Sequence, residues 1–125
     1  MLQAAQSVFI VDDDESVRAS LSMLLESSGH RAVTFASAEE FLQSGLMNDA
    51  RCLILDIRMP GMDGFELQEY LVASEARIPV IFITGHDRLG MEQKAMKLGA
   101  AAYLRKPFDG EALLDALQLA CEKGL

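Results

Sequence analysis

Short apolar runs alternate along the chain with longer segments in which apolar residues recur at helical spacing. The first run, residues 7–11, is rich in β-branched and aromatic residues and predicts a strand. Val17, Leu21 and Leu25 then recur four residues apart, on one face of a helix that Gly29 can end. The alternation continues and predicts five strands, at residues 7–11, 31–36, 52–55, 80–83 and 101–104.

Each predicted strand is followed by a helix with a recognisable apolar face. The residues that form these faces are Val17, Leu21, Leu24 and Leu25; Phe41 and Leu42; Leu67 and Leu71; Met91, Ala95 and Leu98; and Leu113, Leu114, Leu117 and Cys121. Two helices should open with capping boxes, Ser37 with Glu40 and Asp63 with Glu66. We also assign three methionines at helical spacing to the core, namely Met23, Met91 and Met96.

Strict alternation of five strands and five helices predicts parallel β-α-β units with right-handed crossovers. The runs at 52–55 and 80–83 have no polar alternation, as expected of strands buried on both faces. The predicted fold class is therefore α/β, with a five-stranded parallel sheet between two layers of helices.

Size and composition limit the organisation of the chain. It has 125 residues and a mass of 13.7 kDa, and half of it (50%) is hydrophobic, as in an ordinary globular domain. We predict a single domain over residues 1–125, without an effector domain. Because 11 basic and 19 acidic residues leave a net charge of −8, we expect no direct binding of nucleic acid.

The sequence also indicates where the chain resides. No apolar stretch approaches the ~20 residues of a membrane span, and residues 1–6 do not begin a signal peptide. Two cysteines, Cys52 and Cys121, do not form a disulfide framework, and we predict that both are buried thiols in a reducing compartment. A cytoplasmic location follows from these expectations.

Polar residues stand at the ends of four predicted strands. They are Asp12 and Asp13 after the first strand, Asp56 after the third, Thr84 after the fourth and Lys106 after the fifth. In parallel α/β sheets, ligands bind beyond the carboxyl ends of the strands. We therefore expect these side chains to surround one site.

The residue types at this site suit phosphoryl transfer. Clustered carboxylates repel one another unless a cation neutralises them, and Mg²⁺ prefers such oxygen ligands. Lys106 can pair with Asp56 or with a bound anion, and Thr84 can donate a hydrogen bond to that anion. An aspartate can itself be the covalent phosphoryl acceptor.

Four motifs carry a resemblance to a known family. They are Phe9-Ile-Val-Asp-Asp13, Leu53-Ile-Leu-Asp-Ile-Arg-Met-Pro-Gly-Met-Asp-Gly64, Ile83-Thr-Gly85 and Tyr103-Leu-Arg-Lys-Pro107. In this order and spacing the chain resembles the receiver domain of two-component response regulators, the CheY-like family. Thr84-Gly-His86 and Lys106-Pro-Phe108 are most similar to its FixJ type. The resemblance implies a flavodoxin-like fold with strand order 2-1-3-4-5.

The same resemblance implies roles for the residues of the site. Asp56 would accept a phosphoryl group from the phosphohistidine of a sensor histidine kinase. Asp13, Asp56 and the backbone carbonyl of Arg58 would bind Mg²⁺, with Asp12 contributing through a water molecule. Lys106 would pair with the phosphoryl oxygens.

The resemblance also implies how phosphorylation would change the surface of the domain. Thr84 would turn towards the phosphoryl group and Tyr103 would turn inward behind it. The face formed by the fourth helix, fifth strand and fifth helix would then change and be recognised by an effector domain, such as a DNA-binding one, or by a second receiver in a dimer. The chain would be a phosphoacceptor switch and not an enzyme.

Two other functions compete with this interpretation. Asp12-Asp-Asp14-Glu-Ser16 fits the nucleophile motif of haloacid-dehalogenase-type phosphatases, with Asp12 as nucleophile and Asp14 as general acid. In this interpretation Asp56 would have no role, and the acidic pair that these phosphatases have after their lysine is missing. Residues 85–90 have the glycine spacing of a P-loop, but Met91 and Glu92 stand where that loop requires Lys and Ser or Thr.

Overall fold

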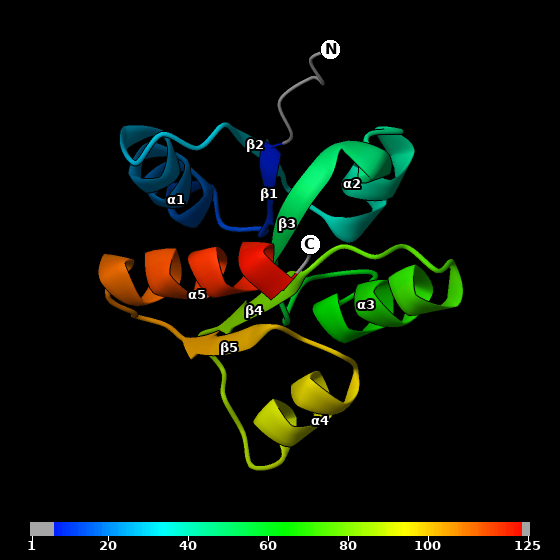
Figure 1. Ribbon diagram of the computed structural model, residues 1–125. Coiled ribbons are helices and arrows are strands. Elements are labelled where there is room, and N and C mark those ends of the chain that lie inside the picture. Colours follow the sequence, from blue (N-terminus) through cyan, green and yellow to red (C-terminus); the bar gives the residue numbers. More distant parts are fainter. Residues whose placement is uncertain (1–6, 124–125) are drawn as a thin grey trace.

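The computed structural model describes residues 7–123, so residues 1–6 and 124–125 of the predicted domain lie outside the described residues. Strands and helices alternate as predicted (Figure 1). In chain order they are β1 (Ser7–Val11), α1 (Glu15–Ser27), β2 (Ala32–Phe35), α2 (Ala38–Gln43), the 3-10 helix η1 (Met47–Asp49), β3 (Ala50–Asp56), α3 (Gly64–Ala73), β4 (Val80–Thr84), α4 (Met91–Lys97), β5 (Ala102–Arg105) and α5 (Gly110–Lys123). All strand pairs are parallel, in the order β2-β1-β3-β4-β5, which confirms the predicted topology.

The sheet is covered by helices on both faces, as Figure 1 shows. Successive residues of each central strand point to opposite faces. In β3, Leu53 and Leu55 join the core under α2, α3 and α4, which we call the α3-side core. Cys52 and Ile54 join the core under α1 and α5, which we call the α5-side core. The central strands therefore need no polar face, which explains their continuous apolar runs.

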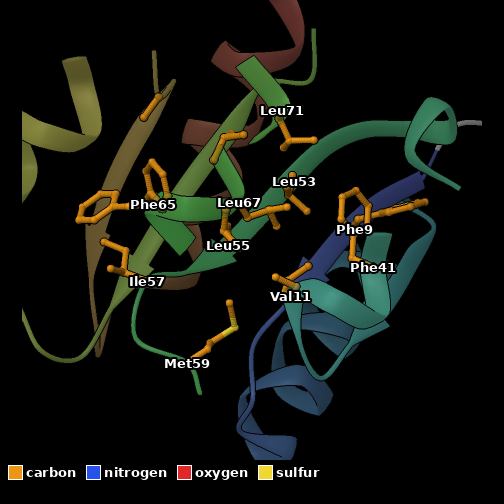
Figure 2. Packing of buried hydrophobic residues seen from close by; sticks show 14 of the residues in the cluster. Phe9, Val11, Phe41, Leu53, Leu55, Ile57, Met59, Phe65, Leu67 and Leu71 are labelled. Carbon is orange, nitrogen blue, oxygen red and sulfur yellow. The ribbon is translucent and has the colours of Figure 1, made fainter. Parts of the chain in front are cut away.

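Figure 2 shows the α3-side core from close by. Phe9 of β1 packs edge-on against Phe41 of α2, with ring centroids 5.7 Å apart. Leu67 and Leu71 of α3 are fully buried or nearly so against the strands. β1 and β3 pair directly in the sheet beneath these side chains, so the residues at their carboxyl ends are also neighbours.

Three local expectations need correction. Glu40 reaches back past Ser37 and accepts from the backbone N–H of Ala36, at 2.7 Å, so only the Ser37 half of the first capping box forms. Met23 and Met96 are exposed instead of buried, at 73% and 48%. Met23 lies on the side of α1 opposite to the buried Leu21 and Leu25, and Met96 lies about 100° around α4 from the buried Ala95.

Most other expectations hold in the described residues. The second capping box, Asp63 with Glu66, is complete. Both cysteines are free, and Cys52 is buried, which raises the pKa of its thiol to about 12. The prediction that Cys121 is also buried is wrong, because Cys121 is only partly buried on α5. None of the helices described between residues 7 and 123 is long and apolar enough to cross a membrane.

Candidate functional site

Three carboxylates meet at the carboxyl edge of the sheet. Asp12 and Asp13 follow β1, and Asp56 is the last residue of the adjacent strand β3. One oxygen from each lies within 4.8 Å of the others, and we call this group the carboxylate cluster. Asp12 and Asp56 are buried, at 0% and 4% exposure, whereas Asp13 faces solvent. The convergence predicted from the strand ends is therefore present.

Lys106 closes the cluster from the end of β5. Its Nζ lies 2.9 Å from Oδ2 of Asp12 and 3.7 Å from Oδ1 of Asp56, so its nearer partner is Asp12 and not Asp56. Burial favours the neutral amine, but the hydrogen bond to Asp12 and the charge of Asp56 outweigh it and raise the pKa of Lys106. The ammonium group thus stays charged beside both buried carboxylates.

Hydrogen bonds hold both carboxylate oxygens of Asp12 and its backbone carbonyl. Its Oδ2 accepts from Lys106, its Oδ1 accepts from the backbone N–H of Asp14 at 2.9 Å, and its carbonyl accepts from Arg18 at 2.8 Å. Asp56 contacts Lys106 only at the longer distance of 3.7 Å. Of the two buried carboxylates, Asp56 therefore has the oxygen that is less engaged and more available to a ligand.

The environment of Asp56 favours its protonated form. Burial and the neighbouring carboxylate of Asp12 raise the pKa of Asp56 to about 7, and the charge of Lys106 opposes this only in part. Crowded, partly desolvated carboxylates of this kind are stabilised by a bound cation, and their oxygen donors suit a hard divalent ion. The cluster fits the predicted Mg²⁺ site by its donor chemistry.

Thr84 completes the edge between β3 and β5. It follows Ile83, which pairs with Asp56 in the β3–β4 register, and its carbonyl accepts from the backbone N–H of Lys106 at 2.7 Å. The side chain is fully buried, and its Oγ1 accepts from the backbone N–H of His86 at 3.0 Å. Thr84 thus occupies the strand end next to that of Asp56.

The loop after β3 is held close to Asp56. A Cβ added to Gly64 would lie 2.4 Å from the carbonyl oxygen of Asp56, so only glycine fits there. Oε2 of Glu39, on α2, accepts from the backbone N–H of Met62 at 2.8 Å. Arg58 lies in this loop with its side chain exposed. The loop that carries the predicted carbonyl ligand is therefore anchored from α2 and α3.

Comparison with known proteins identifies the family. The family model for the response regulator receiver domain matches residues 8–118. The chain belongs to this family. Its sequence is 47% identical to nodulation protein W of Bradyrhizobium diazoefficiens over 116 residues, which are 93% of this chain and 51% of that protein. It is 46% identical to the transcriptional regulatory protein FixJ of Azorhizobium caulinodans, over 89% of this chain and 53% of that protein.

Solved structures agree with this assignment. The crystal structure of FixJ-N matches with a TM-score of 0.84 and 40% identity, covering 97% of this chain and 96% of that one. The response regulator StyR matches with a TM-score of 0.89 and 47% identity, covering 97% of this chain and 61% of that one. The sequence-based assignment to CheY-like receiver domains of the FixJ type is thus confirmed. This receiver chain spans about half the length of the curated relatives it matches.

The predicted switch residue of the receiver, Tyr103, is buried at 8% exposure in the α3-side core. Its hydroxyl donates to the carboxylate of Asp87, which also accepts from Nε of Arg105 at 2.6 Å. Sequence reasoning did not single out Asp87, Arg18 or Glu39. The contacts of Asp87 and Glu39 join segments 16 or more residues apart, and no local motif marks any of the three residues.

The competing functions find little geometric support. Asp14 caps α1, and its Oδ1 accepts from the backbone N–H and hydroxyl of Ser16 at 2.9 and 2.7 Å. These hydrogen bonds lower the pKa of Asp14, which is opposite to what a general acid needs. The segment with P-loop spacing ends at Gly90, the N-cap of the seven-residue α4. Lysine, which a P-loop requires next, is replaced by Met91.

Proposed function

We propose that this receiver domain works as a phosphorelay switch in which Asp56 accepts a phosphoryl group from a sensor histidine kinase. The single observation that carries the proposal is the carboxylate cluster with Lys106 reaching into it. Phosphoryl transfer is catalysed mainly by positioning and by charge stabilisation, and the cluster offers both.

Asp56 is the better acceptor of the two buried carboxylates. Both oxygens of Asp12 already accept short hydrogen bonds, from Lys106 and from Asp14. Asp56 lies at the same edge without such a short contact to Lys106. Its Oδ would attack the phosphorus of the phosphohistidine, the P–N bond would break, and the imidazole nitrogen would keep that electron pair. The product is an acyl phosphate on Asp56 and a histidine on the kinase.

The carboxylate form of Asp56 must be available for this attack. In the metal-free chain, burial and Asp12 hold its pKa at about 7, so part of the population is protonated at neutral pH. Asp13, Asp56 and the carbonyl of Arg58 are the groups that would hold Mg²⁺, with Asp12 contributing through water. The bound cation supplies positive charge that offsets the carboxylates and the phosphoryl oxygens. Lys106 adds a second positive charge at the same place.

The phosphoryl group would act on the rest of the domain through Thr84. It adds negative charge and acceptor oxygens beside the buried hydroxyl of Thr84, and a hydrogen bond to a charged oxygen contributes about 1.5–3 kcal/mol. That range corresponds to roughly a 10- to 150-fold shift between two conformations. Tyr103, on the neighbouring strand, would transmit the change to the face formed by α4, β5 and α5.

The partners and the location follow as proposals from the family. We propose a sensor histidine kinase as phosphodonor, and an effector domain or a second receiver as the partner of the α4-β5-α5 face. FixJ of Azorhizobium caulinodans is described as a transcriptional regulatory protein, so a DNA-binding effector is the favoured kind. Residues 1–125 would form one cytoplasmic receiver domain that does not itself bind nucleic acid and acts as a switch, not as an enzyme.

Incubation with acetyl phosphate and Mg²⁺ tests the proposal. The intact mass should rise by about 80 Da, the mass of one phosphoryl group, and Asp56→Asn should abolish the increase. Asp49→Asn is a matched control, because Asp49 precedes β3 at the opposite end of the strand. A full mass increase in Asp56→Asn would refute the proposal. Steady hydrolysis of small phosphomonoesters that depends on Asp12 would support the phosphatase alternative instead.

A further inference from the structure

A pocket lies at the edge of the sheet opposite to the carboxylate cluster. It is enclosed by the end of α1, the start of β3, the segment that leads into β4, and α5, which can be followed in Figure 1. Its volume is about 650 Å³, within the range of small-molecule sites. We call it the basic pocket, and its lining includes His30, Arg51, Arg77, Leu114, Leu117 and Cys121.

The basic pocket is separate from the phosphorylation site. Arg51 is the second residue of β3 and Asp56 is the last, so five residue steps of extended strand, roughly 16 Å, separate them. Neither the carboxylate cluster nor Thr84 or Lys106 belongs to the lining that the structure describes. Occupation of the pocket therefore does not depend on the proposed phosphorylation of Asp56.

The floor of the basic pocket is apolar. Leu117 is fully buried, and Leu114 and Cys121 are half-buried and pack against the same α5-side core. Pro79, half-buried just before β4, adds an apolar wall. An apolar group placed against this floor leaves water, and burial of that kind is a main source of affinity in small-molecule sites.

The rim of the pocket carries positive charge. Arg51 and Arg77 line it and are exposed, and no ion pair involves either arginine in the part of the chain that the structure describes. The half-buried imidazole of His30 adds a hydrogen-bond donor. The carboxylate of the lining, Glu122, accepts from Nε2 of Gln118 at 3.4 Å. With a neutral imidazole, the rim is left with a single net positive charge.

We propose that the basic pocket binds a small organic carboxylate, with its apolar body on the floor and its carboxylate at Arg51 and Arg77. A guanidinium group presents a planar fork of donors that matches a carboxylate. The whole chain has a net charge of −8 and repels anions, so an anion is held only where cations are concentrated. The single net charge of the rim favours a monovalent carboxylate over a phosphate monoester, which carries nearly two negative charges at neutral pH.

Titration with 2-naphthoate, followed by backbone amide signals in the absence of Mg²⁺, tests this inference. The signals of four lining residues, Arg51, Leu114, Gln118 and Cys121, should move together and give a dissociation constant below about 1 mM. 2-Naphthylmethanol has the same rings without the charge, and acetate has the charge without the rings. Each should bind at least about tenfold more weakly, because each lacks one of the two groups that the pocket recognises.

Variants of the rim test the role of its charge. Arg51→Gln and Arg77→Gln should each weaken binding of 2-naphthoate by about three- to fivefold, and the double variant by about tenfold or more, since pairs with exposed arginines are screened by solvent. Arg31→Gln is the matched control, because Arg31 is an exposed arginine outside the pocket lining and its loss changes the net charge equally. Its dissociation constant should stay within about 1.5-fold of the parent value.

Alkylation of Cys121 by iodoacetamide is a second measurement at the same place. 2-Naphthoate at about ten times its dissociation constant should slow this reaction about tenfold, because it occupies about nine-tenths of the chains. In the double variant of Arg51 and Arg77, the same concentration should slow it only about twofold. Cys52 is buried and the pKa of its thiol is about 12, so its alkylation would instead report a loss of structure.

Three results would each refute the organic-carboxylate site. They are no binding of 2-naphthoate at about 1 mM, equally tight binding of 2-naphthylmethanol, and an unchanged dissociation constant in the double variant. If a short acidic peptide moves the same amide signals and 2-naphthoate does not, the pocket docks a protein segment and the proposal is overturned. In all these cases the phosphorylation of Asp56 stands or falls by its own test with acetyl phosphate.

Discussion

Replacing Asp56 by asparagine removes a buried negative charge and keeps the size of the side chain. In the metal-free chain, burial and Asp12 raise the pKa of Asp56 to about 7, from an ordinary value of 3.8. A group whose pKa is raised by folding stabilises the fold fully below its unfolded value, and this contribution is lost as the pH rises through the folded value. The parent should therefore lose stability between about pH 4 and pH 7, and Asp56→Asn should not show this loss.

The size of the effect follows from the pKa difference. At 1.36 kcal/mol for each pKa unit, the full loss amounts to about 4 kcal/mol, of which about 2 kcal/mol falls between about pH 5 and pH 7.5. The substitution should not leave Lys106 without a partner, because its nearer partner, Asp12, remains 2.9 Å away. The difference in unfolding free energy between Asp56→Asn and the parent should therefore widen by about 2 kcal/mol, in favour of the variant, over this pH range.

Urea unfolding followed by circular dichroism measures this difference, and the chain has no tryptophan to serve as a fluorescent probe. Mg²⁺ at about a hundred times its dissociation constant should stabilise the parent by about 2.7 kcal/mol at neutral pH and should not stabilise Asp56→Asn to this extent. Asp49→Asn, at the far end of β3, should follow the parent at every pH. A difference between Asp56→Asn and the parent that stays constant from pH 5 to pH 7.5 would refute the electrostatic reasoning.

Further predictions concern the loop after β3 and the packing of α1. Gly64→Ala would place a Cβ against the main chain at the end of β3, and we expect a loss of about 1–3 kcal/mol in unfolding free energy together with slower phosphorylation by acetyl phosphate; unchanged values for both would contradict the close approach. Glu39→Gln should raise the hydrogen-exchange rate of the Met62 amide, because the acceptor loses its charge; an unchanged rate would mean that the bond is not formed in solution. Leu25→Ala should cost about 2–5 kcal/mol in urea unfolding, whereas Met23→Ala on the same helix should cost less than about 0.5 kcal/mol, and similar costs would contradict the assignment of their faces.

The fold was predictable because its strands follow a simple rule. The runs around Ile54 and Phe82 are apolar at every position, which only a sheet covered on both faces can accommodate. The boundaries were less predictable: β3 begins at Ala50, two residues before the apolar run, and is preceded by an unpredicted turn of 3-10 helix. Ala50 is in the strand because it pairs with Ser7 of β1, across a register shift at Arg51, and pairing leaves no mark in the composition of a strand end. Met23 was misplaced because its position on α1 lies opposite to that of Leu21 and Leu25.

The candidate site was predictable as a set of strand ends and not as a set of contacts. Asp12 and Asp56 lie close together because each stands at the end of its strand and the two strands, β1 and β3, are neighbours in the sheet. Nothing in the sequence indicates that Lys106 lies closer to Asp12 than to Asp56, since that depends on the path of a long side chain. The partner of Tyr103 was missed for a similar reason: Asp87 lies 16 residues away in an exposed loop, where an acidic residue is common and carries no signal of its own.

Localisation of the phosphoryl group by peptide mapping is the most direct test of the account. After treatment with acetyl phosphate and Mg²⁺, peptide masses should show one added phosphoryl group, and fragmentation should assign it to Asp56 in the peptide that contains the end of β3. Assignment of the phosphoryl group to Asp12, whose two carboxylate oxygens already accept hydrogen bonds, would contradict the proposed division of roles within the carboxylate cluster.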